Sequence, residues 1–367
     1  MTTTDLPLNA SVPGGLDLVP TTDAAQKAKD YTSDQEVRWC PGCGDYAVLA
    51  SVRSFLPELG LKRENIVFVS GIGCSSRFPY YLDTYGMHSI HGRAPTIASG
   101  LAVSRPDLSV WVVTGDGDAL SIGGNHLIHA LRRNMNITIL LFNNRIYGLT
   151  KGQYSPTSEV GKVTKSTPMG SVDAPFNPVS LALGAEATFV GRALDSDRKG
   201  LTEVLRQAAA HRGASLVEIF QDCPIFNDGS FDVLRKGDEA AQRLIPLTDG
   251  APIRFGNDGE YGVVRSASGG LEVAPVAEVG EDALVVHDAG AEDPTQAFGL
   301  SRLSDQDLTH TVTGIFRKVS RPTYDDGARA QVDAAKEEAA RKGDTLDALL
   351  RGKDTWAVAP APEPELR

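Results

Sequence analysis

Residues 114–134 read TGDGDALSIGGNHLIHALRRN, and residues 136–144 read NITILLFNN. The first stretch begins where an apolar run ends, turns through Gly-Asp-Gly, and continues with the apolar spacing of a helix. The second stretch is a short apolar run that ends in two asparagines. Strand, turn, helix and strand in this order predict one unit of a parallel α/β sheet with a right-handed crossover.

The Gly-Asp-Gly turn and the asparagine pair have the chemistry of a site for a diphosphate and a divalent metal. A helix N-terminus offers unpaired N–H groups and a positive dipole end to phosphate oxygens. Asp116 supplies a carboxylate oxygen, Asn144 an amide oxygen and Ile146 a backbone carbonyl. Mg²⁺ prefers a few protein oxygens with phosphate oxygens completing its coordination. A lone Gly-Asp-Gly is usually a surface turn, but asparagines at the end of the next strand favour the metal and diphosphate site.

Other apolar runs along the chain extend the same pattern. They are NIVFVSG (65–71), LSVWVVTGDG (108–117), NITILLFNN (136–144), ATFVG (187–191) and SLVEIFQ (215–221). The runs lack clean alternation, as expected of strands buried on both faces, and segments with helical spacing separate them. The expected fold class is α/β, with a doubly wound, mostly parallel sheet. Ligands of such sheets bind at the carboxyl ends of the strands.

The composition divides the chain into three parts. Residues 1–30 are polar and lack sustained periodicity, so they are expected to form a tail that contacts a partner. Residues 31–235 carry the α/β pattern, and residues 236–367 form a C-terminal extension without recognisable chemistry. Within this extension, residues 253–270 predict a hairpin and residues 325–353 a charged surface helix.

Length, charge and hydropathy exclude several classes of protein. The chain has 367 residues, 41% of them hydrophobic, and a formal net charge of -11, as in an ordinary globular protein. Nucleic acid is not an expected partner because there is no basic stripe. No apolar run reaches the roughly 20 residues that a membrane-spanning helix needs. The N-terminal residues lack the features of a secretory signal, so a cytoplasmic location with reduced cysteines is expected.

Six motifs together resemble the β subunit of 2-oxoacid:ferredoxin oxidoreductases, most closely the 2-oxoglutarate type. They are WCPGCGDY, SGIGCSSRFPYY, HGRAPTIASGL, TGDGDALSIGGNHLIHALRRN, LFNNRIYGLTKGQYSPT and QDCPIFN. The resemblance covers about residues 35–230, and the Gly-Asp-Gly and Asn-Asn pair is similar to the thiamine diphosphate motif. It implies a thiamine-diphosphate-binding fold.

The resemblance also implies roles for individual residues. Asp116, Asn144 and the Ile146 carbonyl would bind Mg²⁺. The residues implied to contact thiamine diphosphate are Ile72, Gly73, Cys74, Ser75, His91, Gly117, Asp118, Gly148 and Leu149. Arg77 would bind the distal carboxylate of 2-oxoglutarate, and Lys151 would lie near the thiazolium. Without the resemblance, both cations are equally consistent with solvated side chains.

The four cysteines of the chain are Cys40, Cys43, Cys74 and Cys223. C-x₂-C with two distant cysteines fits structural zinc as well as an iron–sulfur cluster. The resemblance implies that all four bind a [4Fe–4S] cluster, and oxidative decarboxylation releases electrons that zinc cannot accept. A C-x₂-C-x₂-C-x₃-C segment is missing from the sequence, so no further cluster is expected in this chain.

The implied activity is oxidative decarboxylation of 2-oxoglutarate with coenzyme A to succinyl-CoA and CO₂, with electrons passing to ferredoxin. Only one α/β cofactor domain is visible, whereas thiamine enzymes need two, so an α subunit is expected in an αβ or α₂β₂ assembly. One alternative is a pyruvate or broad-range 2-oxoacid:ferredoxin oxidoreductase. The other is a zinc-stapled subunit without redox activity. His211, His287 and His310 are expected at the surface.

Overall fold

The structure is a computed structural model that describes residues 14–237, 239–304 and 306–359. The chain divides into two compact units, Met1–Asp325 and Asp326–Arg367, and each is described by itself. The expected N-terminal tail is therefore described from residue 14 onward, and residues 1–13 lie outside the described residues.

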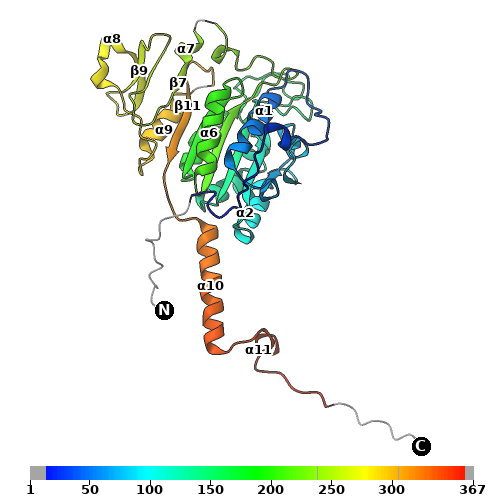
Figure 1. Cartoon of the computed structure of the whole chain (residues 1–367). Helices are drawn as coiled ribbons and strands as arrows, with labels where there is room; N and C mark the ends of the chain where they lie inside the picture. The colour runs from blue at the N-terminus through cyan, green and yellow to red at the C-terminus, as the bar shows by residue number, and fades with distance from the viewer. Residues whose placement is uncertain (1–13, 238, 305, 360–367) are drawn as a thin grey trace, which may run out of the picture. The chain divides into compact units, whose positions relative to one another are not determined.

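An eight-stranded sheet forms the centre of the first unit (Figure 1). Its strands are β1 (Ile66–Ser70), β2 (Tyr85–His88), β3 (Ser109–Gly115), β4 (Ile137–Asn143), β5 (Phe189–Leu194), β6 (Ala214–Phe220), β7 (Leu244–Pro246) and β11 (Thr311–Lys318). The order is β2-β1-β3-β4-β6-β5-β11-β7, and neighbours pair in parallel except for β11 with β5. The predicted α/β class with a mostly parallel sheet is confirmed, and β1, β3, β4, β5 and β6 are the strands expected from the sequence.

Helices cover both faces of this sheet, as the doubly wound pattern predicts. The α-helices that lie wholly within the described part of the first unit are α1 (Asp45–Phe55), α2 (Ala94–Ser104), α3 (Asp116–Leu120), α4 (Gly124–Arg132), α5 (Pro178–Gly184), α6 (Arg198–Ala210), α7 (Ala240–Arg243), α8 (Val276–Val279) and α9 (Thr295–Arg302). Buried residues of α1 and α6 form one hydrophobic cluster with the sheet, and those of α2, α4, α5 and α9 form a second. In Figure 1, α1 and α6 lie in front of the strands.

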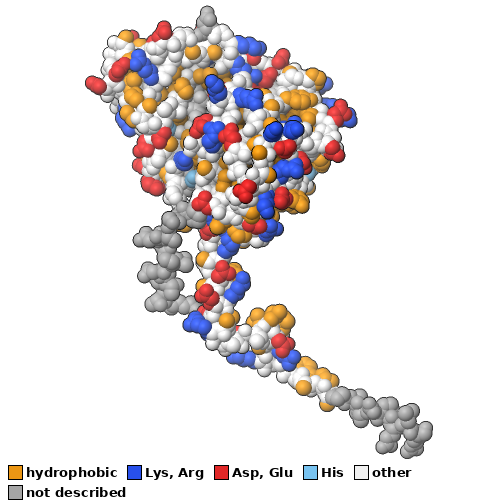
Figure 2. Space-filling view, in the orientation of Figure 1, with side chains coloured by type: hydrophobic (Ala, Val, Ile, Leu, Met, Phe, Trp, Pro, Cys, Tyr) orange, Lys and Arg blue, Asp and Glu red, His pale blue; other side chains and the backbone are white. Residues whose placement is uncertain are grey.

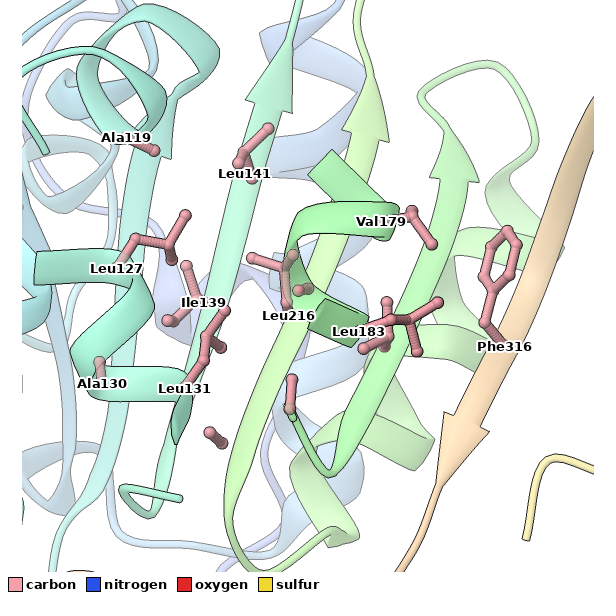
Figure 3. Packing of buried hydrophobic residues seen from close by; sticks show 14 of the residues in the cluster. Ala119, Leu127, Ala130, Leu131, Ile139, Leu141, Val179, Leu183, Leu216 and Phe316 are labelled. Atoms are coloured by element: carbon pink, nitrogen blue, oxygen red, sulfur yellow. The ribbon is translucent and has the colours of Figure 1, made fainter. Parts of the chain in front are cut away.

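Alternate residues of the central strand β4 belong to the two clusters. Leu140 and Phe142 pack with the α1 and α6 face, whereas Ile139 and Leu141 pack with the opposite face. Figure 3 shows Leu131 of α4 beside Ile139 on that second face. Because both faces of β4 are buried, its run is mostly apolar, which is why the sequence pattern there shows no alternation.

Residues of the predicted C-terminal extension take part in the central sheet. Strand β11 pairs antiparallel with β5 and carries a register shift between Ile315 and Arg317, and β7 pairs with β11. A second sheet of three antiparallel strands consists of β8 (Arg254–Phe255), β9 (Tyr261–Arg265) and β10 (Leu271–Pro275). It contains the hairpin expected at 253–270.

The N-terminal segment from residue 14 packs on the α/β domain. The Gly15 N–H donates a 3.0 Å hydrogen bond to the Ala210 carbonyl at the end of α6. Val19 is buried in the cluster of the α1 and α6 face. This part of the expected tail therefore contacts its own chain.

The expectation that His211 and His287 lie at the surface is wrong. Both are buried, His287 with 1% of its surface exposed. His211 Nε2 lies 2.8 Å from Thr188 Oγ1, and His287 Nε2 lies 2.7 Å from the Ile315 carbonyl. Each imidazole has a polar contact with a segment distant in sequence, so no local pattern indicates its burial.

The charged helix expected at 325–353 forms as two helices, α10 (Tyr324–Lys342) and α11 (Leu346–Arg351). Gly343 separates them with φ of 70°, a left-handed conformation that ends helices. The Thr345 side chain then accepts a hydrogen bond from the Ala348 N–H and caps α11.

Acidic and basic side chains are interspersed over the face of the molecule in Figure 2. In the described part of that face, Lys and Arg do not form a continuous stripe. Among the described residues, no helix combines the length and the hydropathy that crossing a membrane requires.

Candidate functional site

A pocket at the carboxyl ends of β1, β3 and β4 collects most of the predicted cofactor residues. The predicted residues that line it are Ile72, Gly73, Cys74, Ser75, His91, Asp116, Gly117, Asp118, Asn144, Ile146, Gly148 and Leu149. Gly115, Phe142, Tyr147 and Thr150 complete the lining. Parallel strands bring these loops to one sheet edge, which is where ligands of such folds bind.

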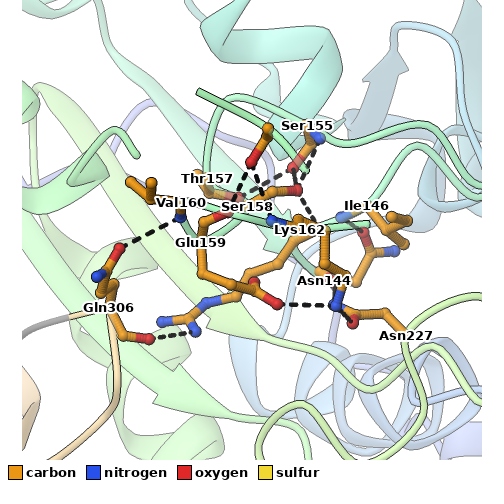
Figure 4. Close-up of polar contacts among 12 residues, drawn as sticks. Asn144, Ile146, Ser155, Thr157, Ser158, Glu159, Val160, Lys162, Asn227 and Gln306 are labelled. Atoms are coloured by element: carbon orange, nitrogen blue, oxygen red, sulfur yellow. Dashed lines mark hydrogen bonds and ion pairs between the residues drawn. The ribbon is translucent and has the colours of Figure 1, made fainter. Parts of the chain in front are cut away.

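Two hydroxyl groups hold the carboxylate of Asp116, which is 2% exposed. Ser155 Oγ and Thr157 Oγ1 donate hydrogen bonds of 2.5 and 2.6 Å to Asp116 Oδ2. Burial raises the pKa of Asp116 to about 6, while the bonds from Ser155 and Thr157 act in the opposite direction. Figure 4 shows Ser155, Thr157 and Ser158 close together in the loop after β4. The carboxylate therefore has a defined orientation at the N-terminus of α3.

The side chain of Asn144 is held at both ends of its amide. Its Nδ2 donates to Gln221 Oε1 at 3.0 Å, and its Oδ1 accepts the Ile146 N–H at 3.2 Å. The Asn144 backbone carbonyl accepts a 2.9 Å hydrogen bond from Asn227 Nδ2, a contact visible in Figure 4. These contacts place the amide oxygen beside the Ile146 backbone.

Only glycine fits at position 117. A Cβ atom there would lie 2.1 Å from Cε1 of Tyr147, and the Tyr147 hydroxyl donates a 2.9 Å hydrogen bond to the Gly117 carbonyl. The Tyr147 ring thus packs directly on the start of α3. The backbone N–H groups at this turn remain free of side-chain bulk, as close approach of a phosphate requires.

Asp118 lines the pocket but its carboxylate is engaged by the surrounding loops. Oδ1 accepts the Gly92 N–H at 2.9 Å and the Ile72 N–H at 3.3 Å, and lies 2.7 Å from His91 Nδ1. Oδ2 accepts the Thr114 hydroxyl at 2.8 Å. The structure therefore shows Asp118 joining the loops after β1 and β2 to α3, so these loops form the wall of the pocket.

The two predicted substrate-binding cations lie outside the pocket lining. Arg77 is half-buried, and its Nη1 donates a 3.1 Å hydrogen bond to the Arg38 carbonyl. Lys151 is exposed, has φ of 80°, and its backbone N–H donates to the Gly148 carbonyl at 3.0 Å. A left-handed φ is strained for a residue with a side chain, and such strain is concentrated at functional loops.

The sulfur atoms of three predicted cluster ligands converge beside the pocket. A Cβ atom built on Gly148 would lie 3.6 Å from Cys74 Sγ and 3.7 Å from Cys223 Sγ. Burial, with Asp45 and Cys223 contributing, raises the pKa of Cys74 to about 11, and the Arg77 guanidinium opposes this. Burial also raises the pKa of Cys43, and the charges of Asp45, Cys223 and Cys74 add to the effect. The thiols of Cys43, Cys74 and Cys223 are thus near enough for the charge of one to affect the pKa of another.

All four cysteines are free thiols, and Cys40 is exposed. Within the described ranges, no group of three or more His, Cys, Asp or Glu residues has an arrangement ready to bind one metal ion. A cubane cluster holds its thiolates farther apart than a single ion does, because each thiolate binds a different iron.

Sequence reasoning missed several residues of the site. Ser155, Thr157, Tyr147 and Gln221 all contact predicted metal or diphosphate residues. The stretch at 154–158, rich in hydroxyl residues, overlaps the end of the motif LFNNRIYGLTKGQYSPT and was the available signal. Gln221 begins the motif QDCPIFN, but nothing in the sequence indicates its partners, because Asn144 and Cys43 lie in two distant segments.

Comparison with known proteins defines the class and then the family. Residues 71–219 match the profile of the C-terminal TPP-binding domain of thiamine pyrophosphate enzymes. The fold is thus that of a thiamine-diphosphate-binding domain.

The relatives include 2-oxoglutarate oxidoreductase subunit KorB of Mycobacterium tuberculosis, which is 75% identical over 93% of this chain and 91% of its own length. A 2-oxoacid:ferredoxin oxidoreductase β subunit of Aeropyrum pernix is 45% identical over 54% of this chain and 64% of its own. A solved structure of 2-oxoglutarate:ferredoxin oxidoreductase from Magnetococcus marinus matches this chain with a TM-score of 0.69 and 35% sequence identity. The match covers 89% of this chain and 95% of that chain. The M. marinus enzyme was solved with 2-oxoglutarate, coenzyme A and succinyl-CoA bound. The chain belongs to the family of 2-oxoacid:ferredoxin oxidoreductase β subunits, and the resemblance read from its motifs is confirmed.

Proposed function

We propose that this chain is the β subunit of a thiamine-dependent 2-oxoglutarate:ferredoxin oxidoreductase. The enzyme oxidatively decarboxylates 2-oxoglutarate with coenzyme A to succinyl-CoA and CO₂, and electrons pass to ferredoxin. The observation that carries the proposal is that Asp116, Asn144 and Ile146 line one pocket in a chain of this family. The ligands bound to the M. marinus relative support the choice of substrate.

Thiamine diphosphate and Mg²⁺ fit the donors of the pocket. The Asp116 carboxylate, the Asn144 amide oxygen and the Ile146 carbonyl are hard oxygen ligands of the kind Mg²⁺ prefers. Gly117 leaves the start of α3 open to a diphosphate, with Gly148 on the opposite wall. When bound, thiamine diphosphate supplies the carbon nucleophile and the electron sink for loss of CO₂.

The remaining lining residues would contact the cofactor from the loops that Asp118 holds together. They are Ile72, Gly73, Cys74, Ser75, His91, Asp118 and Leu149. Asp118 accepts the backbone N–H groups of Ile72 and Gly92 and the Thr114 hydroxyl, so the part of the wall formed by the loops after β1 and β2 is in place before a ligand enters. Such preorganisation reduces the reorganisation needed at the moment of reaction.

A [4Fe–4S] cluster fits the thiols beside this pocket. Cys74 and Cys223 flank Gly148 of the diphosphate loop, and Cys43 is electrostatically coupled to both. Cys40 would complete the set. Thiolates are the usual ligands of such clusters, and a cluster here would accept electrons directly next to the reacting carbon.

Arg77 and Lys151 are the cations that we assign to the substrate. A guanidinium can bind a carboxylate through two parallel hydrogen bonds, so Arg77 would hold the distal carboxylate of 2-oxoglutarate. The Lys151 ammonium would stabilise negative charge that develops near the thiazolium. Both assignments rest on the family resemblance, and in the chain Arg77 follows Cys74 and Lys151 follows Gly148 by three residues.

The proposal includes partners and a division of the chain. An α subunit, in an αβ or α₂β₂ assembly, would provide the second half of the thiamine site, and ferredoxin would accept the electrons. Coenzyme A is the acyl acceptor, and the location is the reducing cytoplasm. The cofactor domain is residues 31–235, with a tail at 1–30 and an extension at 236–367.

The test is anaerobic co-purification of the complex, analysed for bound cofactors and assayed with several 2-oxoacids. We expect iron, magnesium and thiamine diphosphate in the complex, and CoA-dependent reduction of ferredoxin or a viologen with 2-oxoglutarate as the best substrate. A preference for pyruvate would favour the broad-range alternative. A colourless, zinc-containing protein without activity would contradict the proposal. It would favour the alternative of a subunit that binds structural zinc and has no redox activity.

A further inference from the structure

Gln221 is the first residue after β6, at the sheet edge where both predicted cofactor sites lie. Its backbone N–H donates a 3.0 Å hydrogen bond to the Asn143 carbonyl, so the ends of β6 and β4 stay paired one residue beyond the strands. The residue is 1% exposed. Its side chain is therefore confined between the loop that carries Asn144 and the loop that carries Cys43.

The side-chain amide of Gln221 bridges these two residues. Its Oε1 accepts a 3.0 Å hydrogen bond from Asn144 Nδ2, and its Nε2 donates a 3.3 Å hydrogen bond to Cys43 Sγ. Nε2 also contacts the Asp222 carbonyl. Each end of the amide thus has a partner that suits only that end, because Asn144 Nδ2 is a donor and the Asp222 carbonyl is an acceptor.

The bridge determines which way the Asn144 amide points. With Nδ2 directed at Gln221, Oδ1 faces the Ile146 N–H at 3.2 Å, and Asn144 and Ile146 both line the pocket. The reversed amide would set its NH₂ group against the Ile146 N–H and its oxygen against Gln221 Oε1. Outer partners of this kind orient metal ligands, and their loss typically lowers metal affinity about 10- to 100-fold.

The other end of the bridge acts on a sulfur. Hydrogen bonds to cysteine sulfurs are among the factors that set the reduction potential of an iron–sulfur cluster. A donor at Cys43 stabilises negative charge on the sulfur, and the reduced state of a cluster carries one more electron than the oxidised state. A donor at this atom thus favours reduction.

Resting on the proposed function, we propose that Gln221 is a positioning residue shared by the two cofactor sites. Its Oε1 fixes the amide of Asn144 for Mg²⁺, and its Nε2 raises the reduction potential of the cluster through Cys43. One buried amide thus ties the geometry of the diphosphate site to the electron acceptor.

Two variants of the complete αβ complex separate the two ends of the bridge. Gln221→Met removes both hydrogen bonds at similar volume. Gln221→Glu keeps an oxygen for Asn144 Nδ2 and removes the donor to Cys43, when examined at alkaline pH where the introduced carboxyl is ionised. Gln35→Met, at an exposed glutamine, is the matched control.

Two measurements are needed besides turnover. EPR-monitored redox titration gives the cluster potential, and circular dichroism follows thiamine diphosphate binding as Mg²⁺ is added. We expect a more negative potential in both Gln221 variants. Half-saturation by Mg²⁺ should require about tenfold more metal in Gln221→Met and remain near the wild-type value in Gln221→Glu.

The outcomes distinguish the inference from the proposed function. A wild-type complex that holds cluster and cofactor, with Gln221→Met unchanged in potential and in Mg²⁺ half-saturation, overturns the role of Gln221 alone. A wild-type complex without iron or without thiamine diphosphate overturns the proposed function as well. If Gln221→Met fails to assemble, an unchanged potential in Gln221→Glu still overturns the assignment at Cys43.

Discussion

The hydroxyl of Ser155 donates a 2.5 Å hydrogen bond to Oδ2 of Asp116, joining the loop after β4 to the end of β3. Thr157 adds a second hydroxyl to the same oxygen at 2.6 Å. The buried carboxylate that we propose as a Mg²⁺ ligand is thereby kept in one orientation by its own chain. The contact also explains why a loop rich in hydroxyl residues follows the diphosphate motif.

Removing the two hydroxyl groups that hold Asp116, which form a clamp on its carboxylate, should weaken Mg²⁺ binding. For the double variant Ser155→Ala and Thr157→Val, we expect about a tenfold higher Mg²⁺ concentration at half-saturation, because an unheld carboxylate must be ordered on binding. Circular dichroism of thiamine diphosphate binding measures this. Ser166→Ala, at an exposed loop residue, serves as the control. Equal half-saturation in the double variant and the control would contradict the role of the clamp.

A side chain at position 117 should disrupt the diphosphate site. Gly117→Ala places a methyl group 2.1 Å from the Tyr147 ring, so the ring or the start of α3 must move. We expect loss of thiamine diphosphate affinity by more than about tenfold, since overpacking of this kind commonly destabilises by 1–3 kcal/mol. Isothermal titration calorimetry measures the affinity. The added variant Tyr147→Leu should restore part of it, and absence of any rescue would argue against the ring as the cause.

The buried ion pair between Arg192 and Glu218 should be important for stability. Arg192 Nε lies 2.7 Å from Glu218 Oε2, and their side chains are 2% and 0% exposed. Arg192→Met leaves an unpaired buried carboxylate, which is expected to destabilise by about 3–5 kcal/mol. The exposed pair of Arg206 and Glu58 provides the control, because Arg206→Met should change stability by less than about 1 kcal/mol. Urea denaturation compares the two, and similar midpoints would refute the prediction.

His211 should make the protein less stable in mild acid. Burial lowers the pKa of His211 to about 4, with the Lys318 charge contributing, whereas an unfolded histidine titrates near 6.5. Between these values the unfolded chain binds a proton that the folded chain does not, so stability falls as pH drops below about 6.5 and levels off below about 4, by roughly 3 kcal/mol in total.

This pH dependence is measured by denaturation midpoints from pH 7 to pH 4. His211→Gln removes the titrating group, and its amide retains a partner for Thr188. We expect this variant to show a shallower decline than the wild type over the same range. Parallel curves for the two proteins would show that other groups cause the decline.

Arg77 should discriminate between substrates. Arg77→Ala removes the proposed partner of the distal carboxylate, which 2-oxoglutarate has and pyruvate lacks. We expect kcat/KM for 2-oxoglutarate to fall at least about tenfold, the value of a lost charged hydrogen bond, with a much smaller change for pyruvate. Arg77→Lys should recover little, because an ammonium cannot form the two parallel bonds. An equal loss for both substrates would exclude the assignment.

Much of the fold could be predicted because short segments of the sequence indicate its strands and helices. Strand β4 is mostly apolar since both its faces are buried, and the asparagines at its carboxyl end, Asn143 and Asn144, mark the edge of the sheet. The break at Gly343 was missed although glycine is a helix-ending residue, because the charged pattern continues through it. Participation of β11 in the central sheet was also not predicted, since it depends on pairing with β5.

The sequence by itself identified the residues that we propose to carry the chemistry: Asp116 and Asn144 just after two strands, and Cys74 and Cys223 in loops after two others. Residue type and spacing are sufficient there, because parallel strands bring their carboxyl ends to one edge. The tertiary structure alone decided how these groups are held. Ser155 on Asp116, Gln221 between Asn144 and Cys43, and the burial of His211 all arise from segments that meet only when the chain folds, and hydrogen bonds across such distances leave no periodic trace in the sequence.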